Sequence, residues 1–176
     1  LTMELDRSLF QLVVFANLVE EGSWVDAIID QRKANQAGPP QPDLRRMLRP
    51  VGPVGVFGAS NFPFAISVIG NDVVSAWAAG CPVVVKGHPG HPGTCELLGR
   101  CVQDVIRSKN LPEGIFSLIQ GTQNRVGEAL VQHPSIRAIG FTGSLRGGTS
   151  LWALTQKRTD PLSLIHISEP TRRSFI

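Results

Sequence analysis

The first residues of the chain carry apolar side chains at helical spacing. Leu5 and Leu9 belong to a series that recurs every three or four positions, which predicts a helix over residues 3–21. Gly22 follows the last turn, as is typical of a residue that ends a helix. Residues 30–53 are polar and rich in proline, which predicts a surface crossing or an extended arm.

From residue 51 onward, short apolar runs alternate with amphipathic segments. The run Val83-Val84-Val85 is typical of a strand that a parallel sheet buries on both faces. Alternating strands and helices indicate βαβ units, so we expect an α/β fold with a parallel, Rossmann-like sheet and helices on both faces. The expected strands are residues 51–57, 82–86, 115–119 and 137–141, and the expected helices are 64–79, 94–109 (capped by Thr94), 124–132 and one from about 145.

Ligands of a parallel sheet bind where its strands end and its helices begin. Candidate chemistry is therefore expected in the turns that follow the four strands. These turns are residues 57–63, 86–93, 119–125 and 141–148.

Composition excludes several classes of protein. The chain has 176 residues, 42% hydrophobic and 18% charged, which suits one folded domain or a part of a larger one. The net charge of +3 is concentrated in residues 157–176, so no nucleic-acid-binding surface is expected despite a pI of 9.1. No apolar run has the length of a membrane span, the first residues do not form a signal peptide, and three cysteines do not suit a disulfide scaffold. We expect a cytoplasmic protein.

The turn after the fourth strand is a candidate anion site. Gly143 would let the backbone approach a ligand, and Ser144 begins a helix whose N-terminus attracts phosphate. The alternative is an ordinary strand-to-helix turn in which glycine serves only to adopt a positive φ.

Two further polar residues follow buried strands. Asn61 could donate from its amide to a developing oxyanion, or it could simply satisfy the backbone of its own turn. Lys86 could bind a phosphate or ribose hydroxyls, or its ammonium could extend to solvent.

The histidines and cysteines point to no separate chemistry. His88 and His91 have no accompanying third ligand, so no metal site is expected. Cys81 is expected to be a small buried residue, and Cys95 and Cys101 are expected to be packing residues of the 94–109 helix.

Four motifs, in this order and spacing, resemble the aldehyde dehydrogenase superfamily, and the resemblance extends from about residue 5 to residue 161. The segment 86–94 and the pair Gly147-Gly148 are most similar to the NADP-preferring branch, which includes α-ketoglutarate semialdehyde and fatty aldehyde dehydrogenases. The motifs are GPVGVFGASNFP (52–63), AGCPVVVK (79–86), LPEG (111–114) and HPSIRAIGFTGS (133–144).

The resemblance implies roles for individual residues. Asn61 matches the side-chain donor of the oxyanion hole, Lys86 the lysine that holds the adenosine ribose, and the turn through Gly143 and Ser144 the pyrophosphate site. Pro89 stands where NAD-preferring relatives often carry a glutamate, and Arg125 matches a position where an arginine contacts the 2′-phosphate, so NADP is expected, with NAD possible as well. The other implied cofactor-binding residues are Phe57, Gly58, Ala59, Ser60, His88, Phe141, Thr142 and Gly148.

The implied reaction is oxidation of a small aldehyde to a carboxylic acid by a homo-oligomeric parent enzyme. A cysteine nucleophile and a glutamate base are expected downstream of residue 161, and neither motif is present. Residues 1–161 are thus interpreted as a partial cofactor-binding domain, with 1–50 as its helix and proline-rich crossing, and as catalytically incompetent alone. The alternative is a complete, non-catalytic nucleotide-binding or interaction module.

The last residues do not match the family. Residues 162–176 resemble a translated adapter sequence, with a divergent native tail as the alternative. A foreign tail is expected to pack against nothing.

Overall fold

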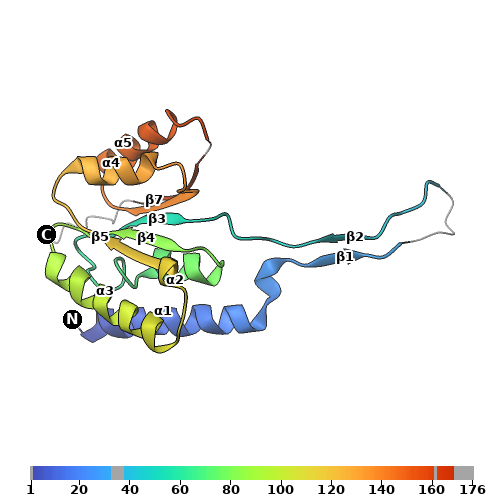
Figure 1. Ribbon diagram of the computed structural model, residues 1–176, viewed down its shortest axis with the longest axis horizontal. Helices are drawn as coiled ribbons and strands as arrows, with labels where there is room; N and C mark the ends of the chain where they lie inside the picture. Colours follow the sequence, from blue (N-terminus) through green and yellow to red (C-terminus); the bar gives the residue numbers. More distant parts are fainter. Residues whose placement is uncertain (1, 33–37, 161, 169–176) are drawn as a thin grey trace, which may run out of the picture.

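A helix and a long two-stranded arm precede the sheet in this computed structural model, which describes residues 2–32, 38–160 and 162–168 (Figure 1). Helix α1 (Thr2–Glu21) and a short 3₁₀ turn, η1 (Ser23–Val25), lead into β1 (Ile28–Asp30). Strand β1 pairs with β2 (Leu44–Arg46) in antiparallel register. The predicted helix and extended arm are both confirmed.

The main sheet has five parallel strands in the order β5-β4-β3-β6-β7. This sheet confirms the predicted α/β fold. Figure 1 shows α4 and α5 on one face and α1, α2 and α3 on the other. The strands are β3 (Val54–Phe57), β4 (Val83–Lys86), β5 (Phe116–Ile119), β6 (Ala138–Thr142) and β7 (Ser163–Ser168), and the helices are α2 (Asn71–Ala78), α3 (Pro92–Ser108), η2 (Glu113–Ile115), α4 (Asn124–Gln132) and α5 (Leu145–Thr155).

Two apolar clusters, one on each face, hold the sheet and its helices together. Alternate residues of a strand point to opposite faces, so Val54 and Val56 join the cluster beneath α2 and α3 while Phe57 joins the cluster beneath α4 and α5. Gly55 allows close packing on the second face, because a Cβ there would lie 2.7 Å from Ile139 Cδ1. The carboxyl ends of the central strands are thereby fixed at one edge of the sheet.

Two predicted helix starts are wrong. The helix predicted over 64–79 begins only at Asn71, because residues 63–69 form turns in which Ile66 N–H donates to Phe62 O. The helix predicted to be capped by Thr94 begins at Pro92, after His91. Proline suits the first turn of a helix because it has no N–H to satisfy.

The expectation that the tail packs against nothing is wrong for residues 162–168. Strand β7 pairs in parallel with β6, with a register shift between Ile139 and Gly140. Leu162 packs against the cluster beneath α4 and α5. The remainder of the tail lies outside the described residues, and the foreign origin of the segment stays a prediction.

Candidate functional site

A cleft of about 780 Å³ opens at the carboxyl edge of the sheet. Parts of all four turns singled out in the sequence line it, because parallel strands end at a common edge. Its predicted lining residues are Phe57, Gly58, Ala59, Ser60, Asn61, Lys86, His88, Pro89, Phe141, Thr142, Gly143 and Ser144.

The segment after β3 crosses one wall of the cleft. Ala59 is buried and fixed at both backbone groups: its N–H donates to Ile66 O at 2.9 Å, and its carbonyl accepts from His91 Nε2 at 3.0 Å. Ser60 and Asn61 follow and are exposed. No described residue forms a hydrogen bond with the Asn61 amide, so the alternative that Asn61 satisfies its own turn is wrong.

Lys86 ends β4 and extends along the sheet edge rather than away from it. Its Nζ donates to the Gly121 carbonyl at 2.9 Å, in the turn that follows β5. Burial lowers the pKa of Lys86 below 10.5, and the nearby Cys95 acts in the opposite direction. An ammonium has three donors, so two remain for a ligand in the cleft.

His88 and His91 lie together in the segment between β4 and α3, with ring centroids 5.6 Å apart. His88 Nδ1 accepts from Gly90 N–H at 3.0 Å. Burial, His91 and Lys86, in that order, lower the pKa of His88 below 6.5. Since both the hydrogen bond and the surroundings favour the neutral ring, His88 contributes little charge to the cleft.

His91 and Cys95 form a partly buried pair behind this turn, in which the cysteine is the buried member. The Ala59 carbonyl can only accept, so His91 Nε2 carries a proton and donates to it, and His91 Nδ1 lies 3.2 Å from the Cys95 sulfur. Cys95 has 0% exposure and Cys81 is buried in the core, as predicted for both. Cys101 is exposed, so the packing role predicted for it is wrong. Of the residues that the structure describes, no cysteine lines the cleft.

Helix α5 begins at the cleft with a side-chain cap. Ser144 Oγ accepts from Gly147 N–H at 3.2 Å. Gly143 does not have the positive φ of the alternative raised above. A Cβ there would lie 2.6 Å from Phe141 Cζ, so any larger residue would require the Phe141 ring to shift. Arg146 also lines the cleft, although a cation in the first turn of a helix opposes the helix dipole.

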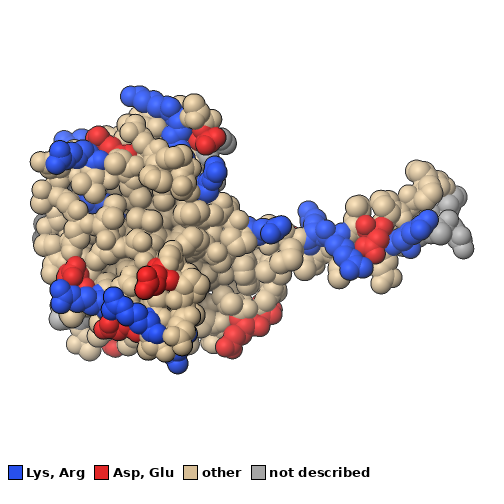
Figure 2. All heavy atoms as spheres, in the orientation of Figure 1, with Lys and Arg blue, Asp and Glu red and all other residues tan. Residues whose placement is uncertain are grey.

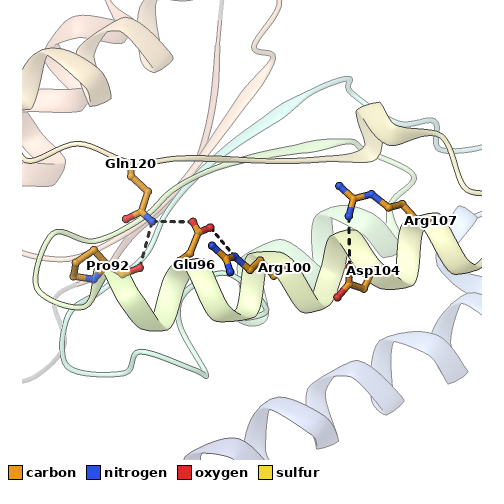
Figure 3. A network of polar contacts seen from close by, with 6 residues as sticks. All are labelled: Pro92, Glu96, Arg100, Asp104, Arg107 and Gln120. Atoms are coloured by element: carbon orange, nitrogen blue, oxygen red, sulfur yellow. Dashed lines mark hydrogen bonds and ion pairs between the residues drawn. The ribbon is translucent and has the colours of Figure 1, made fainter.

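A polar network outside the cleft joins the end of β5 to α3. Gln120, directly after β5, donates from Nε2 to the Pro92 carbonyl and to Glu96, both on α3 (Figure 3). Glu96 also accepts from Arg100 Nε at 2.9 Å. The turn after β5 accepts the hydrogen bond from the Lys86 ammonium, and this network holds that turn against the start of α3.

Two predicted residues are not part of the lining. Arg125 is exposed on α4, although its neighbour Asn124 lines the cleft, and Gly148 is buried behind Gly147. Sequence inspection did not single out Glu128. It follows Asn124 by four residues and therefore lies on the same face of the helix. The other lining residues not predicted are Thr122, Gln123, Gly127, Arg146, Gly147, Ser150, Leu151 and Leu154.

Two searches of the described residues gave no candidates. No group of three or more His, Cys, Asp and Glu side chains there could hold a metal ion. Nor is any described helix long and apolar enough to cross a bilayer.

Comparison with known proteins gives consistent matches. The profile of the aldehyde dehydrogenase family matches residues 15–165. The chain is 45% identical over 159 residues to alpha-ketoglutaric semialdehyde dehydrogenase 2 of Azospirillum brasilense and 46% identical over 159 residues to alpha-ketoglutaric semialdehyde dehydrogenase of Acinetobacter baylyi. Each match covers 90% of this chain and 30% of the relative, so the chain spans under a third of the length of these curated relatives.

Solved structures share the fold. Glyceraldehyde-3-phosphate dehydrogenase GapN from Methanocaldococcus jannaschii, complexed with NADP, matches with a TM-score of 0.68 at 22% identity, over 92% of this chain and 32% of that one. An oxidoreductase from Marinobacter aquaeolei matches with a TM-score of 0.67 at 26% identity, over 89% of this chain and 31% of that one.

Proposed function

The chain belongs to the aldehyde dehydrogenase family, and on that premise we propose that it is the cofactor-binding part of an NADP-preferring enzyme that oxidises an aldehyde to a carboxylic acid. The observation that carries the proposal is the convergence of Lys86, Asn61 and the start of α5 on one cleft. An ammonium, an amide donor and a helix N-terminus together suit a phosphorylated ligand.

The cleft fits a dinucleotide in size and charge. Ligand pockets span about 300–1,000 Å³, and the volume here is about 780 Å³. Lys86 and Arg146 bring positive charge to the lining and Glu128 brings negative charge. The cations favour an anionic ligand, and the Glu128 carboxylate suits hydroxyl groups of a ribose.

Each residue would have a distinct task. Lys86 would donate its two remaining N–H groups to ribose hydroxyls or phosphate, and the first turn of α5 would receive the pyrophosphate. The Asn61 amide would donate to the oxygen that gains charge when a nucleophile adds to the aldehyde. The bound dinucleotide would supply the hydride acceptor.

We expect no aldehyde oxidation by the chain alone. The reaction needs a thiolate beside the cofactor, and no cysteine of the described chain lines the cleft. NADPH production by the purified chain, with an acyl group on one of its cysteines, would contradict this expectation.

The substrate of the parent enzyme is proposed to be a small semialdehyde of the α-ketoglutarate type. Two relatives at 45% and 46% identity that bear this name support the proposal. We further propose a cytoplasmic location, which three unpaired thiols suit.

We also propose that the parent enzyme is a homo-oligomer. The arm of β1 and β2 extends away from the sheet (Figure 2) and exposes apolar side chains such as Ile29, Leu44 and Met47. An isolated two-stranded ribbon is only marginally stable in water, so a surface on a second copy is the expected partner.

Cofactor preference provides the test of the proposal. Arg125 forms no hydrogen bond or ion pair with the described residues, and its side chain is exposed beside the cleft-lining Asn124, so it is available to a 2′-phosphate. A hydrogen bond to a charged group contributes about 1.5–3 kcal/mol, so Arg125→Ala should weaken NADP binding by about one to two orders of magnitude and leave NAD binding unchanged.

Calorimetric titration of both dinucleotides into wild type and variant measures this selectivity. Arg146→Ala is the matched comparison: Arg146 lies at the pyrophosphate end of the cleft, so its loss should weaken NADP and NAD alike. Equal effects of Arg125→Ala on the two dinucleotides would remove the phosphate role of Arg125.

A further inference from the structure

The turn that carries Asn61 is closed by a residue far away in the sequence. Residues 62–66 form a single helical turn, because Ile66 N–H donates to the Phe62 carbonyl at 3.1 Å. Phe62 is therefore the N-cap of this turn, Pro63 its first residue, and Phe64 and Ala65 the second and third. The N–H groups of the second and third residues normally bond to the N-cap side chain, and phenylalanine has no acceptor.

Glu4 supplies the missing acceptor from helix α1. Its Oε1 accepts from Phe64 N–H at 2.7 Å and from Ala65 N–H at 3.0 Å. Two further α1 residues fix this contact: Ser8, fully buried, donates to the Glu4 carbonyl at 3.0 Å, and the Arg7 guanidinium lies 6.0 Å from the centre of the Phe62 ring.

This arrangement relieves Asn61 of a competing role. Asparagine is among the preferred N-cap residues, and Asn61 directly precedes Phe62, so its amide is the nearest local group that could satisfy the two N–H groups. Because Glu4 already does so, the Asn61 side chain has no partner among the described residues and stays in the lining of the cleft.

We propose that Glu4 is a positioning residue of the site: its carboxylate caps the 62–66 turn and thereby leaves the Asn61 amide free to donate into the cleft. A second hydrogen bond, from His91 to the Ala59 carbonyl, anchors the same segment just before Asn61 in the sequence. The inference rests on the proposed function only for what Asn61 donates to; the capping itself is independent of it.

Amide hydrogen exchange in the purified chain tests the capping. Glu4→Ala should raise the exchange rates of the Phe64 and Ala65 amides by about tenfold or more, since the acceptor is lost. Glu4→Gln keeps an oxygen acceptor and should restore most of the protection. Glu20→Ala, on the same helix and remote from the turn, should leave both amides unchanged.

A double-mutant cycle tests the consequence for Asn61. In wild type, Asn61→Ala should not change the free energy of unfolding, because its amide is unbonded. In the Glu4→Ala background the Asn61 amide is expected to take over the cap. The Asn61 side-chain resonance of Glu4→Ala should therefore differ from that of wild type, and adding Asn61→Ala to this variant should shift its urea midpoint downward. If Glu4→Ala does not fold, the same cycle is run with Glu4→Gln, where a smaller coupling of the same sign is expected.

The outcomes separate the two proposals. Unchanged exchange at Phe64 and Ala65 in folded Glu4→Ala, or additive effects of the two substitutions in the cycle, would overturn the role of Glu4. Absence of NADPH binding by wild type would overturn the proposed function and leave the exchange result to decide the capping.

Discussion

The sheet and the N-terminal region of this chain carry similar amounts of apolar sequence but bury it very differently. Strands β3, β4 and β6 are covered on both faces, and Val85 and Ile139 have 0% exposure. In α1, Ser8 is the buried residue, while Leu9 is 52% and Phe10 68% exposed. An apolar pattern thus predicts the element, but a covering surface decides whether that pattern contributes to stability.

The same contrast explains where the cleft lies. Residues 54–61 and 138–144 are held by buried strands with a closed hydrogen-bond ladder, so the groups at their ends keep fixed positions. The arm has a ladder on one side only, and its edges are open. A site that must place several groups within hydrogen-bond distance belongs on the first region, and a surface that awaits a partner belongs on the second.

Truncation of equal-sized side chains in the two regions should have very different effects. Ile139→Ala removes buried atoms from the cluster beneath α4 and α5 and should lower the free energy of unfolding by about 2–5 kcal/mol. Leu9→Ala, on the exposed face of α1, should stay within about 0.5 kcal/mol of wild type. Urea denaturation of both variants measures the difference, and similar losses would show that α1 is covered in solution.

The glycine that precedes α2 should be the next most sensitive position. A Cβ at Gly70 would lie 2.6 Å from Ser67 N and 2.7 Å from Ala65 O, both backbone atoms that cannot easily move. Gly70→Ala should cost about 1–3 kcal/mol through overpacking. Gly114→Ala, where a Cβ meets nothing within 4 Å, is the matched control; equal thermal midpoints for the two variants would contradict the packing described for residues 65–70.

The smallest expected effect is a pH dependence at the cleft. The pKa of His88 is lowered below 6.5, chiefly by burial, so the unfolded chain takes up a proton before the folded chain does. Stability should therefore fall as the pH drops from about 7 to about 5. His88→Gln should flatten this part of the curve. A wild-type stability that rises over the same interval would contradict the environment described for His88.

The sequence predicted the sheet well because its information there is local. Helix 124–132 has the predicted bounds, and all four strands lie within two or three residues of the predicted ones. The valine run at 83–85 favours a strand inside the sheet. Because the strands are parallel, the turns that follow them lie at one edge of the sheet. That edge contains all predicted site residues except Arg125 and Gly148.

What could not be predicted depends on contacts between distant residues. The turns at 63–69 interrupt an apolar stretch that favours helix, and the cap that stabilises them comes from Glu4, about sixty residues earlier. The pairing of residues 163–168 with β6 likewise depends on a sheet edge built by residues earlier in the chain. The exposure of α1 was invisible because periodicity reports an apolar face and not what covers it.

Titration of the purified chain with NADPH, followed by the change in nicotinamide fluorescence, tests the central claim most directly. Saturable binding with one site per chain is expected, and Lys86→Met should weaken it by about tenfold or more because the cleft loses a charged donor. Lys109→Met, beyond the last residue of α3 and outside the cleft, should bind like wild type. A folded chain that does not bind NADPH, or a Lys86→Met variant that binds it as tightly as wild type, would contradict the assignment of the cleft.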